Sequence, residues 1–212
     1  MIRAVVSDFG GVLTAPLLTA FKRATADGGV PLEALGKAMV RAAERHGESP
    51  IFPLERGEIS EGEFIARVEA ELPHVTGAQA SLGGLGERLM SALEPNDGMF
   101  DYFRELRGRG LRLAILTNNV REWEARWRAL LPIDEVFELV VDSAFVGLRK
   151  PDPAIYALTL DRLGLPGEAC AFVDDLEVNV AAAREQGMHG IHFRDTAQAI
   201  AELDALVGDR AA

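Results

Sequence analysis

The sequence of 212 residues contains one cysteine, Cys170. A single cysteine excludes an internal disulfide and any metal site built from several thiolates. Because Cys170 lies in the apolar stretch ACAFVDD at 169–175, we expect a buried, unreactive thiol. The longest hydrophobic runs are too short to span a membrane, and the run at 4–6 is too short for a signal peptide. The sequence therefore predicts a reduced, soluble, cytoplasmic protein.

Positive charge is also scarce. Lysine and arginine total 22 against 33 aspartates and glutamates, which gives a formal net charge of −11. This balance argues against nucleic acid or an anionic membrane as a partner, because both favour a basic surface. A small phosphorylated metabolite remains compatible, since one local cation site can neutralise it. With 48% hydrophobic residues, the chain can form a substantial core.

Short apolar runs without alternation predict the buried strands of a parallel sheet. The runs lie at 3–8, 111–118, 139–144, 169–175 and, more weakly, 190–193. Helical patterns separate them, at 101–110, 152–164 and 179–187, and each pattern ends on a glycine. Strands that alternate with helices in this way predict a doubly wound, Rossmann-like α/β sheet.

The segment 17–95 departs from this alternation. It holds amphipathic helical patterns and no convincing strand, so we expect a small helical cap inserted after the first strand. The predicted domains are therefore a helical cap at 17–95 and an α/β core at 1–16 and 96–212. Proline and glycine interrupt the helical pattern near Pro16 and in EPNDG at 94–98, where we place the hinges.

Polar side chains stand at the ends of the predicted strands. Ligands of open α/β sheets bind outside the carboxyl ends of the strands, so these side chains are the candidates for a site. They are Asp8, Thr117, Asn118, Asp174 and Asp175. Lys150 joins them from GLRKPDPAIY, just before a predicted helix. Carboxylates, a hydroxyl, an amide and an amine on one rim suit Mg²⁺-assisted transfer of a phosphoryl group.

Each of these groups has a chemical use in such a transfer. The Asp8 carboxylate can attack phosphorus and form an acyl phosphate, which divides a difficult hydrolysis into two easier steps. Thr117 and nearby amides can hold the phosphate oxygens, and the Lys150 ammonium can balance their charge.

A cation is favoured at the same rim. The adjacent carboxylates of Asp174 and Asp175 repel each other unless a metal ion or a lysine offsets their charge. Mg²⁺ takes oxygen ligands and keeps several waters, so one or two carboxylates and a backbone carbonyl are enough. Gly10 and Gly11, which follow Asp8 closely, let the backbone approach phosphate and metal.

Four segments together resemble a known family. DFGGVLT, LTNN, GLRKPDPAIY and FVDDLEVN are similar, in this order, to the four motifs of the haloacid dehalogenase-like (HAD) hydrolases. The spacing resembles the subfamily with a helical cap after the first motif, which includes the phosphatase domain of soluble epoxide hydrolases and small sugar-phosphate phosphatases. LERGEISEGEF at 54–64 also resembles a stretch of those caps.

The resemblance implies a role for each matched position. Asp8 matches the nucleophile, Thr117 and Asn118 match phosphate-binding residues, and Lys150 matches the lysine that stabilises charge. Asp175 matches a direct Mg²⁺ ligand, together with Asp8 and the Gly10 carbonyl. Asp174 and Asn179 then support the metal directly or through water.

Gly10 departs from the family pattern. Most phosphatases of the family carry an aspartate two residues after the nucleophile, which protonates the leaving group and later activates water. Glycine offers no proton there, and such acid–base help is worth roughly 10²–10⁴ in rate.

Three functions stay open at this point. The leading one is a Mg²⁺-dependent phosphatase that acts on a small phosphate monoester through phospho-Asp8. The second is a metal-independent 2-haloacid dehalogenase, which the pair Asp174 and Asp175 disfavours because such enzymes typically lack it. The third is a catalytically weak or inactive protein that binds a phosphoryl ligand, which Gly10 favours.

Overall fold

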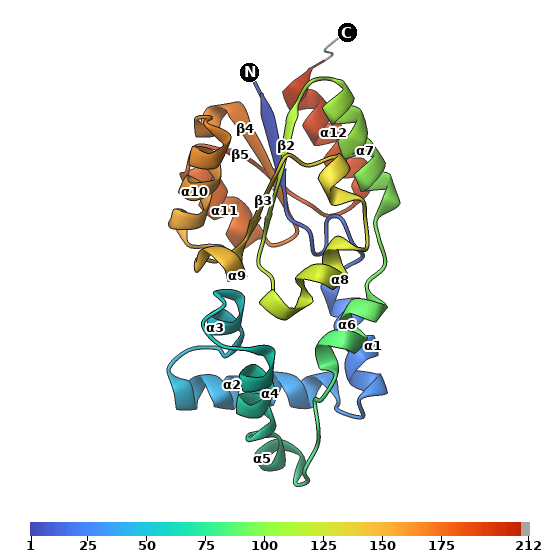
Figure 1. The fold of residues 1–212 in the computed structure, drawn as a ribbon, viewed down its shortest axis with the longest axis vertical. Helices are drawn as coiled ribbons and strands as arrows, with labels where there is room; N and C mark the ends of the chain where they lie inside the picture. The colour runs from blue at the N-terminus through green and yellow to red at the C-terminus, as the bar shows by residue number, and fades with distance from the viewer. Residues whose placement is uncertain (209–212) are drawn as a thin grey trace.

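A computed structural model describes residues 1–208 and contains a five-stranded parallel sheet in that range (Figure 1). The strands run in the order β3-β2-β1-β4-β5. Their bounds are β1 Ala4–Ser7, β2 Arg112–Thr117, β3 Leu139–Asp142, β4 Cys170–Asp174 and β5 His189–His192. The chain order reverses on either side of β1, so the predicted doubly wound α/β fold is confirmed.

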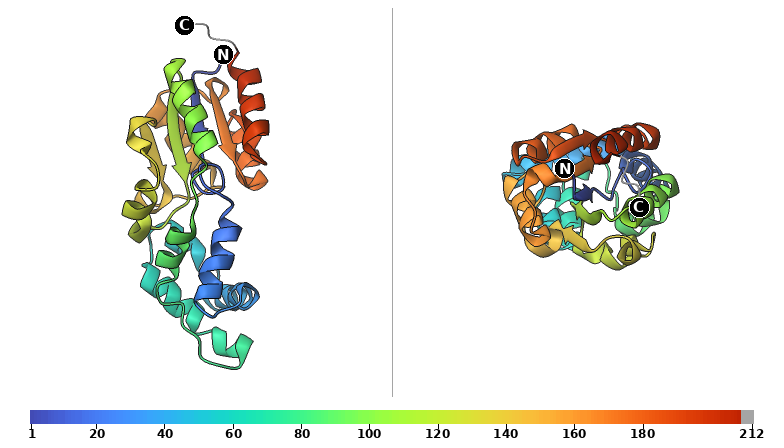
Figure 2. Two further views of the ribbon diagram at one scale, coloured as in Figure 1. Left: turned by 90° about the vertical axis from the view of Figure 1, so that its right-hand side faces the viewer. Right: turned by 90° about the horizontal axis from the view of Figure 1, so that it is seen from above.

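Helices cover both faces of this sheet (Figure 2). Alternate strand residues point to opposite faces, and both sets are apolar. Val5 and Val173 belong to the hydrophobic core shared with α7 (Asp97–Gly108) and α12 (Thr196–Val207). Val6 and Phe172 belong to the core beneath α10 (Pro153–Leu163). On that same face α11 (Glu177–Glu185) packs against β4 and β5. Burial on both faces explains why the strands read as continuous apolar runs.

The register of the sheet brings the strand ends together. Ser7, the last residue of β1, pairs with Ile115 of β2 on one side and with Val173 of β4 on the other. The next residue, Asp8, donates its backbone N–H to the Val173 carbonyl at 2.8 Å. The polar residues that follow β1, β2 and β4 therefore share one edge of the sheet.

A group of helices lies beyond this edge, between β1 and α7 in the chain (Figure 1). They are α1 Leu17–Asp27, α2 Leu32–His46, α3 Ile51–Glu55, α4 Glu61–Glu69, α5 Leu72–Thr76 and α6 Leu85–Ala92. The amphipathic patterns anticipated α1, α2, α4 and α6, whereas the five-residue helices α3 and α5 are too short to show periodicity. The division into a core and a cap domain stays a prediction.

The chain enters and leaves these helices along one path. Thr14 and Pro95 form an isolated antiparallel bridge, and the Ala15 N–H donates to the Glu94 carbonyl at 2.8 Å. The two connections lie side by side at the positions where we placed the hinges.

One expected strand is shorter than predicted. The run 139–144 ends as a strand at Asp142, and Ser143–Val146 forms the short helix α9. Asp142 causes this change because its carboxylate accepts from the Ala144 N–H at 3.0 Å and caps the helix. The remaining short elements are η1 Arg121–Trp123, α8 Glu124–Arg128, η2 Ile133–Glu135 and η3 Gly167–Ala169.

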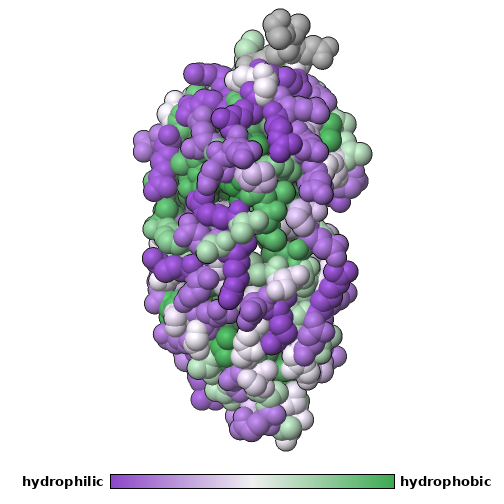
Figure 3. All heavy atoms as spheres, turned by 45° about the vertical axis from the view of Figure 1, so that its right-hand side comes forward, coloured by the Kyte–Doolittle hydropathy of each residue, from purple (hydrophilic) through white to green (hydrophobic). Residues whose placement is uncertain are grey.

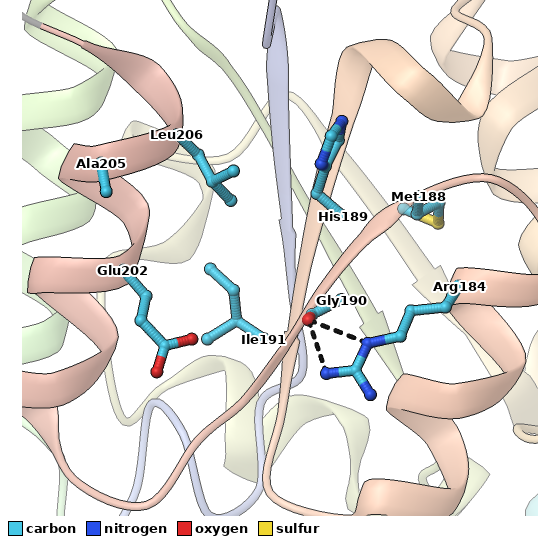
Figure 4. Close-up of a pocket in the computed structure, with 8 residues that line it drawn as sticks. All are labelled: Arg184, Met188, His189, Gly190, Ile191, Glu202, Ala205 and Leu206. Carbon is cyan, nitrogen blue, oxygen red and sulfur yellow. Dashed lines mark hydrogen bonds between the residues drawn. The ribbon is translucent and has the colours of Figure 1, made fainter.

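The outer strand β5 is protected at one of its carbonyls. Arg184 of α11 donates two hydrogen bonds to the Gly190 carbonyl, at 3.2 and 2.9 Å, beside a hollow of about 470 Å³ (Figure 4). Gly190 leaves room for this contact, since a Cβ there would lie 2.9 Å from the Arg184 Cγ. Satisfying an edge carbonyl in this way opposes pairing with another chain.

Hydrophilic residues dominate the face drawn in Figure 3, in keeping with the high charge of the sequence. Within residues 1–208 no helix is both long and apolar enough to cross a membrane. Cys170 is fully buried and free of a disulfide, and its burial raises the pKa of the thiol to about 11. The prediction of a buried cysteine is therefore confirmed, and its lack of reactivity stays a prediction.

Candidate active site

Lys150 stands at the centre of the site. Its Nζ lies 2.8 Å from Asp8 Oδ1 and 2.7 Å from Asp174 Oδ2, and the lysine side chain is 1% exposed. The loop that carries it is tied to β2, because Asn118 accepts from the Lys150 N–H at 2.8 Å and donates to its carbonyl at 3.0 Å. A buried ammonium between two carboxylates is thus held from both its backbone and its side chain.

Both carboxylate oxygens of Asp174 accept hydrogen bonds from other residues of the protein. Oδ1 accepts from the Leu176 N–H at 2.8 Å and from Asn179 Nδ2 at 3.0 Å, while Oδ2 accepts from Lys150 Nζ. Tyr156 in turn donates to the Asn179 carbonyl at 2.9 Å. This network fits a carboxylate that positions the lysine.

Burial and like charges shift the ionisation of the site. Burial raises the pKa of Asp8 to about 7, against the opposing effect of Lys150. Burial, and then the charge of Asp174, raise the pKa of Asp175. For Lys150, burial alone would lower the pKa, but Asp174 and Asp8 together raise it above its usual value. The cluster therefore holds more negative charge than one lysine can balance.

This charge and geometry fit a divalent cation. Asp8, Asp174 and Asp175 each offer a carboxylate oxygen, and these oxygens lie within 4.8 Å of one another. Three carboxylates and one ammonium leave a formal charge of −2. The ion pair with Lys150 and the hydrogen bond from the Phe9 N–H both go to Asp8 Oδ1. Hard oxygen donors in this arrangement are those that Mg²⁺ prefers.

Of the predicted phosphate-binding residues, one lines the cavity over Asp8 and another is buried at the end of a strand. Thr117 is buried at the end of β2, and Asn118 lines the cavity over Asp8. The Gly11 N–H donates to Thr14 Oγ1 at 3.1 Å, and a Cβ on Gly11 would collide with Asp175. Gly11 also has a left-handed backbone, with φ 81°, so both its conformation and the close approach of Asp175 require glycine. The phosphate-binding roles of Thr117, Asn118 and Gly11 stay predictions.

The space beside Gly10 is filled by a residue that sequence reasoning missed. A Cβ on Gly10 would lie 2.9 Å from Cδ1 of Leu17, the first residue of α1. The φ of Gly10 lies outside the left-handed region, so the backbone itself does not require glycine. Leu17 thus occupies the position into which a second acid would project. No sequence signal links the two residues.

A cavity of about 590 Å³ opens over Asp8, Lys150 and Asp175. Phe52 and Glu55 of α3 line its far side. There Arg149 pairs with Glu55 at 2.7 Å and stacks on the Phe52 ring at 4.0 Å. Glu55 lies in LERGEISEGEF, so the resemblance of that stretch to family caps was the signal that could have identified it.

The two tryptophans pack within the protein. Trp127 is fully buried against Phe9, with ring centroids 4.8 Å apart, and Trp123 is 9% exposed beside Gly86 of α6. Neither lines the cavity over Asp8. Their place in the core rules out a stacking platform for substrate there.

A doubly wound sheet with a carboxylate–lysine centre at its switch point defines an α/β fold of the kind whose ligands bind where the chain order reverses. Comparison with known proteins makes the class specific. The chain matches the family described as haloacid dehalogenase-like hydrolase over residues 2–187. It belongs to this family of hydrolases, and the resemblance predicted from the four motifs is confirmed.

Individual relatives agree with this assignment. Acyl-CoA dehydrogenase family member 10 from Mus musculus is 30% identical over 97% of this chain, and bifunctional epoxide hydrolase 2 from Sus scrofa is 27% identical over 98%. The chain spans only 19% and 39% of those two proteins. A sesquiterpene phosphatase from Aspergillus oryzae is 31% identical over 64% of this chain and 71% of its own length.

A solved structure shares the fold. A HAD family enzyme from Bacteroides thetaiotaomicron, in complex with magnesium and inorganic phosphate, has a TM-score of 0.67 and 20% sequence identity. The likeness covers 89% of this chain and 92% of the other. At this identity the similarity concerns the fold alone.

Proposed function

We propose that this chain is a Mg²⁺-dependent phosphatase that hydrolyses a small phosphate monoester through a phospho-Asp8 intermediate. The observation that carries the proposal is the state of Asp8, whose Oδ1 is held by Lys150 and which lines the cavity together with Asp175. A carboxylate that is held at one oxygen can act as a nucleophile through the other.

The chemistry balances as two displacements at phosphorus. Asp8 Oδ2 forms a bond to phosphorus as the ester P–O bond breaks, and the alcohol oxygen departs with the electron pair and takes a proton from solvent. Water then attacks phosphorus, inorganic phosphate leaves, and the Asp8 carboxylate is restored. Asp8, Asp175 and the Gly10 carbonyl would hold Mg²⁺, which would neutralise charge on the phosphoryl oxygens.

The protein's own residues set up both steps. Lys150 offsets the charge on Asp8 and on the equatorial oxygens, and Asp174 and Asn118 hold Lys150 in place. Helices α1–α6 act in this proposal as a cap over residues 1–16 and 96–212 that excludes water during transfer.

The comparisons support a phosphorylated substrate. One relative is a sesquiterpene phosphatase, another is a phosphorylated carbohydrates phosphatase from Thermotoga maritima, and the Bacteroides enzyme was solved with magnesium and inorganic phosphate. A binding protein without turnover is the second candidate, because Leu17 fills the space of the missing acid.

Hydrolysis of p-nitrophenyl phosphate, whose leaving group needs little protonation, tests the proposal. We expect activity with Mg²⁺, its loss in excess EDTA and its return when Mg²⁺ is added back. Asp175→Asn should behave like chelation, whereas Asp97→Asn, at an exposed position on α7, should retain full activity. Full activity in EDTA would contradict the metal requirement, and release of halide from a 2-haloacid under those conditions would favour dehalogenation.

A further inference from the structure

Most of the polar side chains that line the cavity over Asp8 already have partners in the protein. Asn118 bonds to the Lys150 backbone, Asn179 to Asp174, and Glu55 to Arg149 at 2.7 Å. Asp8 is paired with Lys150, and the Arg149 guanidinium is engaged by Glu55 and by the ring of Phe52. A substrate that carries several hydroxyls would have to break some of these contacts or leave hydroxyls without partners, and both cost binding energy.

The rest of the cavity wall is apolar. It is formed by Pro16, Leu17, Leu18, Phe52, Leu176 and Val178. Three of these residues are unusually exposed for aliphatic side chains: Leu18 at 57%, Leu176 at 54% and Val178 at 58%. They come from two different segments, α1 and the region around the start of α11, and meet at one mouth. Exposed apolar side chains that converge on a cavity mark a binding surface.

From this arrangement we propose that the substrate is a phosphate monoester with an apolar organic group, which lies against Leu18, Leu176 and Val178 while its phosphoryl group meets Asp8. The proposal rests on the proposed function and names its substrate class. The volume of 590 Å³ lies within the usual range of small-molecule sites, about 300–1,000 Å³.

Leu17 adds a second restriction. Because it fills the space beside Gly10, the leaving oxygen meets a leucine where a proton donor would otherwise stand. The site therefore favours an organic group that is apolar next to the ester oxygen as well as farther out.

A series of 4-alkylphenyl phosphates tests the proposal, because the acidity of the leaving phenol stays nearly constant along it. Each methylene that is fully buried strengthens binding about fourfold. We expect kcat/KM to rise at least tenfold from 4-methylphenyl to 4-hexylphenyl phosphate. We also expect 4-propylphenyl phosphate to exceed 4-(2-hydroxyethyl)phenyl phosphate about tenfold, since the two differ only by a methyl and a hydroxyl.

A pair of valines provides a matched control. Val178→Ser removes apolar surface at the mouth and should reduce the hexyl-to-methyl ratio at least threefold. Val40→Ser changes a valine of nearly equal exposure, 59% against 58%, on α2 outside the cavity, and should leave the ratio unchanged. A flat series, a preference for the hydroxyl compound, or equal effects of the two variants would overturn the substrate class.

Direct binding separates this proposal from the proposed function. Dissociation constants of the same compounds are measured with the Asp8→Asn variant, which keeps the cavity and removes the nucleophile. If the affinity of this variant rises with chain length while the parent protein shows no turnover of any compound in the series, the apolar site is supported and the phosphatase is refuted. Turnover that depends on Mg²⁺ and Asp8 but not on chain length would support the phosphatase and refute the apolar substrate.

Discussion

Replacing Gly10 by aspartate tests whether Leu17 occupies the place of the missing acid. The Cβ of the new residue would lie 2.9 Å from Leu17 Cδ1 and 3.2 Å from Leu17 Cγ, so one of the two side chains has to move. The backbone itself accepts the change because the φ of Gly10 is not left-handed. We therefore expect Gly10→Asp alone to gain no turnover of alkyl phosphates, since Leu17 displaces its carboxyl from the leaving oxygen.

The double variant Gly10→Asp, Leu17→Ala should behave differently. Overpacking typically costs about 1–3 kcal/mol, and the flexible, half-buried Leu17 places Gly10→Asp at the low end, about 1 kcal/mol. Truncating Leu17 removes all three atoms that crowd the new Cβ, so the double variant should be more stable than the sum of the single changes by about 1 kcal/mol. With the carboxyl in place, turnover of hexyl phosphate should rise at least tenfold relative to p-nitrophenyl phosphate.

The assay combines urea unfolding of the four proteins of the cycle with kcat for the two substrates. Mg²⁺ affinity is measured alongside, so that a damaged metal site is not mistaken for missing acid catalysis. If the two changes are additive in stability, or if Gly10→Asp alone gains as much as the double variant, Leu17 does not hold the acid's position.

Three further outcomes follow from the same structure. Lys150→Met leaves the Asp8 and Asp174 carboxylates buried without their cation, so urea unfolding should show a loss of about 3–5 kcal/mol, whereas the exposed Lys37→Met should stay within about 0.5 kcal/mol. Burial raises the pKa of Asp142 to about 6 from an ordinary value of 3.8, so the folded state holds this proton more tightly than the unfolded state. As the pH rises through that window, the parent should lose up to about 3 kcal/mol relative to Asp142→Asn, and parallel stability curves would contradict the shift. Exchanging residues 17–95 for the corresponding segment of a relative should change substrate preference more than the rate on p-nitrophenyl phosphate, and an unchanged preference would refute the cap's role.

The sequence predicted those parts of the molecule that depend on local pattern. The strands β1 and β4 are buried on both faces, as Val5 and Val6 or Phe172 and Val173 show. Their apolar runs can therefore be recognised in the sequence without knowing which strands pair. The rule that parallel strands end at one edge then brought Asp8 and Asp174 together.

The remaining features depend on contacts between distant segments. Glu55 and Arg149 are 94 residues apart, and their pairing depends on how α3 packs against α9. Leu17 beside Gly10 depends in the same way on where α1 begins. The hydrogen bond between Asn118 and the Lys150 backbone joins two loops, and no sequence periodicity predicts such a contact.

The central claim is that Asp8 is phosphorylated during turnover, and trapping that species tests it most directly. The parent and Asp8→Asn are mixed with Mg²⁺ and p-nitrophenyl phosphate, quenched in acid within one turnover and mapped by peptide mass spectrometry. We predict one phosphoryl group on the peptide that contains Asp8 in the parent and none in the variant. Substrate hydrolysis at equal rates by the two proteins, with that peptide unmodified in both, would contradict the account.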